Sequence, residues 1–587
     1  MIDLPDDWRC GHRSAIGLSI FVNDPNAISG SGGRGRRWRA VGFRLAAVLL
    51  AILPFILAEA GLRLFGVGRP EESADALSGF NQRLPLFVRQ GPVYRTAKAR
   101  EPYFYPQEFA AAKPRNGFRA FCFGGSTVYG HPYVGETAFP KWLELEMSAL
   151  DPARSHEVIN CGGVSYASYR LVPLVREVLQ YQPDLVILAT GHNEFLEDRT
   201  YQAIKTRSAL RTKLENAAHS LRLVNLARRW TGKGKADHKV ELSPEVETKL
   251  DQASGYASYH RDDAWRERVI AQYEESVRTM VSDCRAAGVP VMLVKLGANL
   301  RDCPPFKSEH RPGLAADQER AWQAAFEAGG AAEATNTPGA LDCYRKAETM
   351  DAEYALLAYR IARTLDRLGR RPEALQYFSK AKEQDVCPLR IIAPFQEILT
   401  RVAAEAGVPL VDAAALIATQ APDAIPGFDW YLDHVHPNIG GHQRIAQALA
   451  EQMRRSGPNS NSSPWPTEAR RQTYAEHLKH LGPRYFSDGR RRVDWLDTWA
   501  RRQRLSGEAL PCDAQGYARL GFRCLDLGDE EGAREALGKA LQADLETLGL
   551  IRARVREVES EGRAEAAASL LQDLADLTQR PRPGAGQ

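Results

Sequence analysis

Continuous apolar runs recur along residues 117–195, and each run ends in small or polar residues. Three of them are FRAFCFGG (118–125), EVINCGG (157–163) and PDLVILATG (183–191). Runs without polar alternation are typical of strands buried on both faces of a parallel sheet. We therefore expect three neighbouring parallel strands in this part of the chain.

Amphipathic stretches separate these runs and predict helices. FPKWLELEMSAL (139–150) and YRLVPLVREVLQ (169–180) carry apolar residues at helical spacing. Two later apolar runs, VPVMLVKL (289–296) and VPLVDAAALI (408–417), predict a fourth and a fifth strand. Strands that alternate with helices predict a three-layer α/β/α domain, in which about five parallel strands are covered on both faces.

One apolar run near the N-terminus has a different character. LAAVLLAILPFILA (45–58) has no charge and follows the arginine-rich stretch GSGGRGRRWRA (30–40). The wider window 41–67 reaches the length of about 20 residues that a transmembrane helix needs. The arginines place residues 1–40 in the cytoplasm and the chain after about residue 67 outside, in the periplasm or at the outer face. A cleaved signal peptide is the alternative, because Ala58-Glu59-Ala60 resembles an A-x-A cleavage site.

An internal repeat indicates additional helices. ALDCYRKAETMD (340–351) realigns with ALQYFSKAKEQD (374–385) at a spacing of 34 residues. This period is typical of tetratricopeptide (TPR) helix pairs. A related unit, LGDEEGAREALGKALQAD, occupies residues 527–544. Such repeats often present a concave surface to a protein partner, although plain packing against the main domain explains them equally well.

These patterns divide the chain into eight segments. In order, they are a cytoplasmic tail (1–40), a transmembrane anchor or signal segment (41–67), a connecting segment (68–115), the first part of the α/β domain (116–315), a TPR-like helical insertion (316–386), the second part of the α/β domain (387–455), a linker (456–466) and a C-terminal helical TPR-like region (467–580). Residues 200–265 are polar and irregular, and we expect them to form a lid or an insertion over the sheet.

Composition and charge exclude one class of function. The chain carries 77 basic and 73 acidic residues, a net charge of only +4, whereas a nucleic-acid protein needs a concentrated basic face. Its hydrophobic content of 44% and charged content of 26% fit a folded globular protein.

The candidate chemistry lies where the predicted strands end. Ser126 follows the first strand directly, at the edge of a parallel sheet where ligands bind. Asp433 and His436 lie three residues apart in DHVHPNIGGHQRIA, a spacing that lets a carboxylate orient an imidazole. Asn193, in GHNE, follows the third strand, and its amide could donate to a developing oxyanion.

Four stretches together resemble the sequence blocks of the SGNH/GDSL hydrolase superfamily: FGGSTVYG (123–130), NCGGVSYAS (160–168), GHNE and DHVH. The resemblance implies that Ser126 is the nucleophile, His436 the base and Asp433 its orienting acid. It also implies that Asn193 and the N–H of Ser126 belong to the oxyanion hole. The family needs no cofactor.

The sequence departs from the family pattern at two blocks. The second block normally supplies a backbone N–H to the oxyanion hole, and two registers place either Gly163 or Ser165 there. In the third block, Glu194 stands where the family has an aspartate, which affects the positioning of Asn193.

Other residues near the blocks have competing interpretations. His434 and His436 could form a metal-binding H-x-H pair, but no further cluster has ligand spacing. His131 and His192 could line the pocket or simply be packed. Arg301, with Lys307, could hold an anionic substrate group or lie in a solvated loop.

The sequence therefore predicts an exported, membrane-anchored serine esterase that acts on an ester-bearing small molecule or an acylated glycan. An O-acyltransferase acting on envelope polysaccharide would use the same residues. An interaction protein, with TPR-like repeats and an inactive hydrolase domain, is the alternative from another class.

Overall fold

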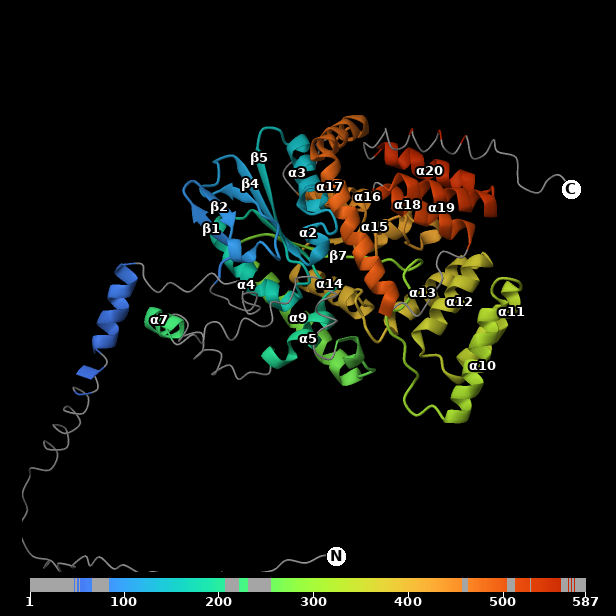
Figure 1. Ribbon diagram of the computed structural model, residues 1–587. Coiled ribbons are helices and arrows are strands. Elements are labelled where there is room, and N and C mark those ends of the chain that lie inside the picture. Colours follow the sequence, from blue (N-terminus) through green and yellow to red (C-terminus); the bar gives the residue numbers. More distant parts are fainter. Residues whose placement is uncertain are drawn as a thin grey trace, which may run out of the picture. The chain divides into compact units, whose positions relative to one another are not determined.

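The structure is a computed structural model, and its described parts fall into two compact units. The described residues are 53–65, 84–205, 221–230, 255–456, 463–503, 513–527 and 529–560, with a few isolated positions besides. The first unit comprises Met1–Glu71 and Leu210–Lys235, and the second comprises Glu72–Ala209 and Ala236–Gln587 (Figure 1). We describe each unit by itself.

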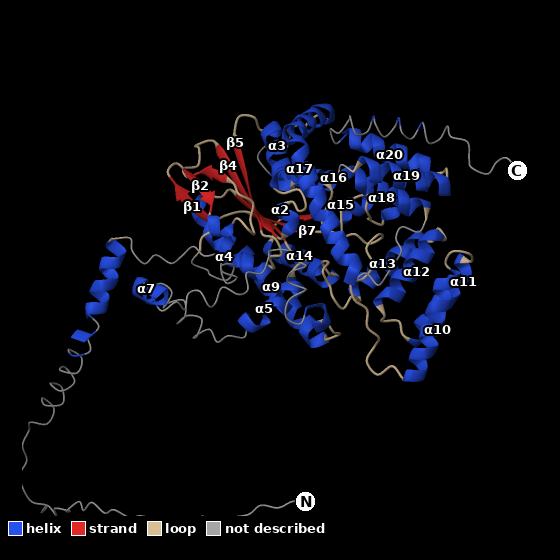
Figure 2. Cartoon of the chain, in the orientation of Figure 1, coloured by secondary structure: helices blue, strands red, loops and turns tan. Residues whose placement is uncertain are grey.

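A five-stranded parallel sheet forms the centre of the second unit (Figure 2). Its strands lie in the order β5-β4-β6-β7-β8. Their bounds are β4 Gly117–Gly124, β5 Ser155–Gly162, β6 Leu185–Ala189, β7 Val291–Lys295 and β8 Leu410–Asp412. This sheet confirms the predicted α/β class with five parallel strands.

Helices cover both faces of the sheet. Successive strand residues point to opposite faces, so a continuous apolar run places apolar side chains on both. Phe121 and Phe123 of β4 belong to one apolar cluster, and Ala120 and Cys122 to another. The first cluster contains residues of α4 (Ser168–Val178), α9 (Asp263–Ala286) and α14 (Ala393–Ala406), and the second contains residues of α3 (Phe139–Leu150), α15 (Ala413–Gln420) and α16 (Ile439–Ser456). Both faces of the strands are therefore buried, as the apolar runs predict.

The fifth strand is shorter than its apolar run. The sequence predicts a strand over 408–417, but β8 ends at Asp412 and α15 follows at once. The Asp412 carboxylate accepts a hydrogen bond from the N–H of Ala415 at 2.9 Å, which caps the new helix. The alanines that follow Asp412 have high helix propensity, so the run divides at this residue.

The connecting segment 68–115 contains a small sheet that the sequence analysis missed. Strands β1 (Phe87–Gln90), β2 (Val93–Thr96) and β3 (Glu108–Ala110) pair antiparallel. The rings of Phe87 and Phe109 meet edge to face at 5.0 Å and join the core beside Phe121. Three or four residues per strand are too few for alternation to stand out in the sequence.

Two groups of helices accompany the α/β domain. An inserted group comprises α10 (Ala316–Ala332), α11 (Thr337–Met350), α12 (Ala355–Arg367) and α13 (Arg371–Glu383). A C-terminal group comprises α17 (Thr467–Gln503), α18 (Ala514–Asp526), α19 (Glu530–Ala543) and α20 (Thr547–Ser560). The additional helical region is confirmed, whereas the TPR assignment rests on the sequence period alone.

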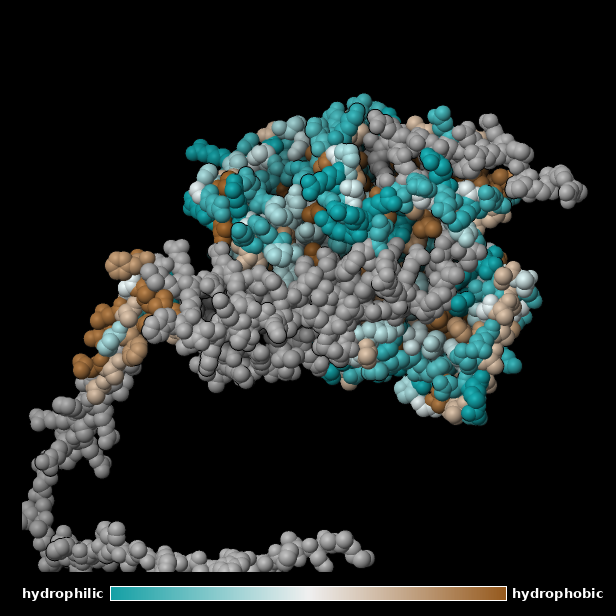
Figure 3. All heavy atoms as spheres, viewed as in Figure 1, coloured by the Kyte–Doolittle hydropathy of each residue, from teal (hydrophilic) through white to brown (hydrophobic). Residues whose placement is uncertain are grey.

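The first unit contains the N-terminal apolar segment. Residues 53–64 are helical, and Leu53, Phe55 and Leu64 are exposed, with brown side chains along this helix in Figure 3. Within the described residues, we find no helix that combines the length and the hydropathy needed to cross a bilayer.

Much of the predicted lid lies outside the description. Of residues 200–265, positions 206–220 and 231–254 are not described. The segment Leu210–Lys235, with α7 (Arg222–Trp230), groups with the N-terminal unit. The lid over the sheet stays a prediction for this segment.

Candidate active site

Ser126 lies at the carboxyl end of β4, on the first residue of a four-residue helix, α2 (Ser126–Tyr129). Gly125 is the N-cap of this helix, and no side chain caps it. A serine at such a corner most often caps the helix with its hydroxyl. Here the Ser126 hydroxyl is directed elsewhere, to His436.

Glycines at the strand ends permit close approaches that other residues would block. A Cβ on Gly125 would lie 2.5 Å from the Asn193 amide nitrogen. A Cβ on Gly162 would lie 2.1 Å from the backbone nitrogen of Tyr129, in α2. The glycines therefore let the strand ends β4, β5 and β6 converge on Ser126.

The structure brings Ser126, His436 and Asp433 together in one hydrogen-bonded chain. The Ser126 Oγ lies 2.7 Å from His436 Nε2. His436 Nδ1 lies 2.5 Å from Asp433 Oδ2. When Asp433 is ionised it can only accept, so Nδ1 of the neutral ring carries the hydrogen. Nε2 is then the acceptor for the serine hydroxyl, as general-base chemistry requires.

The loop around Asp433 is folded onto its own carboxylate. Asp433 Oδ1 accepts hydrogen bonds from the N–H groups of Val435 and His436, both at 2.8 Å. The Asn299 amide donates to the Asp433 carbonyl at 3.1 Å, and the Asn299 N–H donates to the His434 carbonyl at 3.0 Å. Asn299 follows β7, so the loop is tied to the edge of the sheet.

Electrostatics keep the Asp433 carboxyl ionised. Burial alone would raise the pKa of Asp433, but the neighbouring His436 and His434 rings hold this pKa well below its usual range. The hydrogen bonds that His436 donates act in the same direction. The carboxylate can therefore stabilise a positive charge that develops on His436.

The three side chains are buried in this conformation. Ser126 and Asp433 are each 7% exposed, and His436 is 3% exposed. Hydrogen bonds at this depth are little weakened by water, because the local dielectric constant is low. The geometry can support nucleophilic attack by Ser126, assisted by proton transfer to His436.

Three strand ends supply candidate donors for an oxyanion. Asn193 is buried, and its amide nitrogen already donates to the Tyr166 carbonyl at 3.2 Å, which fixes its orientation and leaves its second hydrogen. The N–H of Gly163 donates to the Gly124 carbonyl at 3.0 Å, within the sheet. Ser165 has a left-handed φ of 58°, which is uncommon for a residue other than glycine. Such backbone strain is concentrated at functional sites.

Glu194 holds the second block against the third. Its two carboxylate oxygens accept from the N–H and the hydroxyl of Ser168, both at 2.8 Å. Ser168 is the first residue of α4, so the carboxylate lies at the positive end of that helix. The longer glutamate thus has a structural role beside Asn193.

The other histidines near the site are buried and neutral. Burial lowers the pKa of His131 and of His192 to about 3. Burial lowers the pKa of His434 to about 4. The centroids of the His131 and His436 rings lie 4.7 Å apart, so His131 lines the candidate site. Among the described residues, no group of three or more His, Cys, Asp or Glu could hold a metal ion.

Two basic residues considered as substrate ligands have protein partners instead. Arg301 is 2% exposed and pairs with Asp366 at 3.0 Å and Asp423 at 3.3 Å. Lys307 donates to the Tyr259 carbonyl and lies 3.3 Å from Glu309. The hypothesis that Arg301 lies in a solvated loop is therefore wrong, and its contact with a substrate stays a prediction.

The chain matches none of the known protein-family models and none of the curated proteins. Among solved structures it is similar to Axe2, an acetylxylan esterase from Geobacillus stearothermophilus, at 13% identity over 58% of this chain and 96% of that chain, with a TM-score of 0.25. A protein described as lipolytic and of the G-D-S-L family, from Desulfitobacterium hafniense DCB-2, aligns at 10% identity over 57% of this chain and 98% of that chain, also with a TM-score of 0.25. With identities and TM-scores this low, the function of this chain must be argued from its own site.

Proposed function

We propose that this chain is a serine hydrolase of the SGNH/GDSL type that cleaves a carboxylic ester. One observation carries the proposal: the Ser126 Oγ lies 2.7 Å from His436 Nε2, and Nδ1 of the same ring lies 2.5 Å from Asp433. The nucleophile, its base and the group that orients the base are thus within hydrogen-bonding distance of one another.

In the proposed reaction, Ser126 Oγ attacks the ester carbonyl carbon while its proton passes to His436 Nε2. Asp433 stabilises the imidazolium that forms. The bond to the alcohol breaks as His436 returns the proton to the leaving oxygen. A water molecule, deprotonated by His436, then releases the acid from the acyl-serine.

The tetrahedral oxyanion would be stabilised by the Ser126 N–H, the Asn193 amide and a backbone N–H of the second block. The Gly163 N–H donates to the Gly124 carbonyl, and both registers, with Gly163 or with Ser165 as the donor, stay open. The left-handed conformation of Ser165 reorients the backbone at this position. Donors of this kind contribute about 10²- to 10³-fold each in kcat.

A turnover assay tests the proposal. The full chain, purified in detergent, should hydrolyse p-nitrophenyl acetate, and Ser126→Ala should abolish the activity above background. Asp433→Ala should lower kcat by about 10³- to 10⁴-fold. Wild-type turnover in the Asp433→Ala variant would contradict the assigned triad.

Acyl transfer to a sugar hydroxyl is a second candidate, favoured by the burial of the triad. Ser126 is 7% exposed, and a site that excludes water lets another alcohol compete for the acyl-enzyme. Envelope polysaccharide would be the acceptor. Supplying p-nitrophenyl acetate with an oligosaccharide acceptor distinguishes the two: acetylated sugar supports transfer, and free acetate alone supports hydrolysis. The hydrogen-bonded triad argues against an inactive hydrolase domain that serves only as a scaffold.

We further propose that residues 41–67 anchor the chain in a membrane, with the catalytic domain outside the cytoplasm. The support is the charge-free run after an arginine cluster and the exposure of Phe55 (66%) and Leu64 (82%) on its helix. The protein should stay with membranes under alkaline extraction. A mature N-terminus at about residue 60 would show instead that the segment is a cleaved signal peptide.

A further inference from the structure

The loop that carries Asp433 and His436 contacts helices from the far C-terminal end of the chain. Asn438, two residues after His436, donates to Asp526 Oδ2 at 2.7 Å. Asp526 is the last residue of α18, and Arg554 of α20 donates to both of its carboxylate oxygens, at 2.9 and 3.0 Å. The side chains of Asp526 and Arg554 are 0% and 3% exposed, so this contact is enclosed by protein.

Asn438 transmits this contact to both ends of the loop. The Asn438 amide nitrogen also donates to the Asp429 carbonyl at 2.9 Å, and its oxygen accepts from the Gly441 N–H at 2.8 Å. Arg523, on α18, donates to the Leu432 carbonyl at 2.5 Å, next to Asp433. The helices therefore contact the loop on both sides of the Asp433–His436 pair, at the Leu432 carbonyl before it and at the Asn438 side chain after it.

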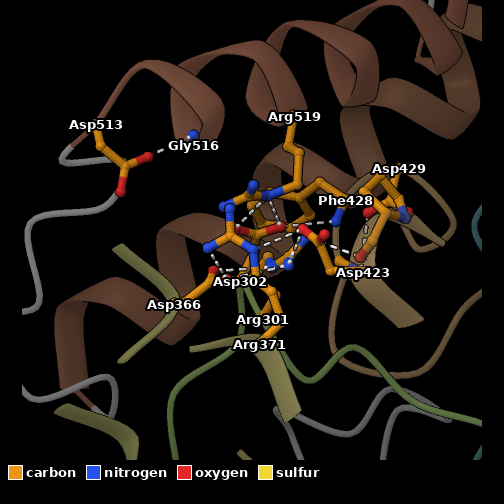
Figure 4. Close-up of polar contacts among 12 residues, drawn as sticks. Arg301, Asp302, Asp366, Arg371, Asp423, Phe428, Asp429, Asp513, Gly516 and Arg519 are labelled. Carbon is orange, nitrogen blue, oxygen red and sulfur yellow. Dashed lines mark hydrogen bonds and ion pairs between the residues drawn. The ribbon is translucent and has the colours of Figure 1, made fainter. Parts of the chain in front are cut away.

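A second junction fixes the start of the loop (Figure 4). Asp302, after β7, accepts from Arg519 Nε of α18 at 2.9 Å and from the Phe428 N–H at 2.9 Å. One carboxylate thus joins the C-terminal helices to the first residues of the catalytic loop. The preceding residue, Arg301, pairs with Asp366 of α12, so the inserted helices meet the same point.

The C-terminal helices also dock on the α/β domain away from the catalytic loop. Arg470 of α17 pairs with Glu146 of α3 at 2.6 and 3.1 Å, and Tyr474 donates to the same carboxylate at 2.6 Å. None of these side chains hydrogen-bonds to the loop. This pair provides a comparison, because losing it would loosen docking without touching the loop directly.

We propose that α18 and α20 position the catalytic loop, with Asp526 and Arg519 as positioning residues for Asp433 and His436. The inference rests on the proposed hydrolase function for its kinetic consequence. The C-terminal helices are then part of the catalytic machinery and not a separate binding module. A displacement of catalytic side chains by about 1 Å can lower the rate by about 10²-fold, so small movements of these helices would change kcat.

The test compares Asp526→Asn, which keeps the shape but removes the charge, with Arg470→Gln as the matched control. Full-length variants are assayed in detergent for fluorophosphonate labelling rate across pH, for kcat and KM on p-nitrophenyl acetate, and for hydrogen exchange of the peptide covering 427–438. Asp526→Asn should lower labelling and kcat about 10- to 100-fold with little change in KM, and should accelerate exchange in that peptide. Asp526→Glu should restore part of the rate.

Arg519→Gln, at the second junction, should also lower labelling and kcat and accelerate exchange. It replaces Asp526→Asn in the test if that variant does not fold. Wild-type exchange and labelling in both variants would overturn the proposal, as would an equal loss in Arg470→Gln. Absence of labelling in wild type would instead refute the hydrolase function, and the exchange measurement would still decide whether the helices hold the loop.

Discussion

Gly125→Ala isolates the contribution of Asn193 to the site. Gly125 has φ −87° and ψ −152°, a conformation that alanine also adopts, so the backbone itself tolerates the change. The added Cβ would lie 2.5 Å from the Asn193 amide nitrogen, whereas van der Waals contact needs about 3.5 Å. The amide must therefore move by about 1 Å.

This displacement should remove most of the stabilisation that Asn193 provides. Loss of one oxyanion donor costs about 10²- to 10³-fold in kcat, or about 2.7–4 kcal/mol, and we expect Gly125→Ala to lower kcat by about 10²-fold. KM should change little, because the donor acts on charge that develops in the transition state. p-Nitrophenyl acetate kinetics measure both constants.

Two comparisons make this prediction refutable. Gly330→Ala, where the added Cβ would meet nothing closer than the Tyr344 hydroxyl at 3.9 Å, should leave kcat unchanged. Adding Gly125→Ala to Asn193→Ala should cost little more than Asn193→Ala alone, because both changes remove the same interaction. Wild-type kcat in Gly125→Ala, or a full additional loss in the double variant, would refute the oxyanion role of Asn193.

Three further variants test the site and its surroundings. Asp433→Asn should lower kcat by about 10⁴-fold while His436 stays in place, because the ring loses its orienting acceptor; unchanged turnover would contradict this role. Ser165→Gly should raise the free energy of unfolding by up to about 1 kcal/mol, because glycine relieves the left-handed φ of 58°. If only the backbone N–H acts, kcat should stay within about threefold of wild type, and a large loss of kcat would assign the role to the hydroxyl. Burial lowers the pKa of His442 to about 3, so the folded protein holds this ring neutral. The contribution of the neutral ring to the free energy of unfolding is therefore complete above pH 6.5 and is lost as pH falls. The Asn oxygen of His442→Asn can still accept from the Phe139 N–H, so this variant keeps the hydrogen bond but does not titrate. In urea unfolding, the difference in the free energy of unfolding between wild type and His442→Asn should therefore be about 2 kcal/mol smaller at pH 5 than at pH 7.5. The same difference at both pH values would contradict the neutral histidine.

The features that the sequence predicts are those carried by local pattern. The strands beside Ser126 and Asn193 are continuous apolar runs, and burial on both faces gives such runs their composition. Ser126 and the candidate oxyanion donors follow strand ends, and parallel strands bring their carboxyl ends to one edge. The topology of the sheet therefore explains why Ser126 lies close to the candidate oxyanion donors.

Contacts between distant segments leave no such pattern. The sequence does not distinguish three residues from other polar positions on amphipathic segments: Asn438, Asp526 and Arg554. Only the folded chain brings them into contact. The sequence also leaves the register of the second block open, because the direction of a backbone N–H, such as that of Gly163 toward the Gly124 carbonyl, depends on the folded chain. Asn299 was missed as a support of the loop, although an asparagine just after a strand is a weak signal of such a role.

The most direct test of the account is the site of covalent labelling by a fluorophosphonate probe, determined by peptide mass spectrometry on the full-length protein. A single adduct on the peptide containing Ser126, absent in Ser126→Ala and slowed in His436→Asn, is the predicted result. A folded protein that takes up no probe, or that carries the adduct on another serine, would contradict a nucleophile at position 126.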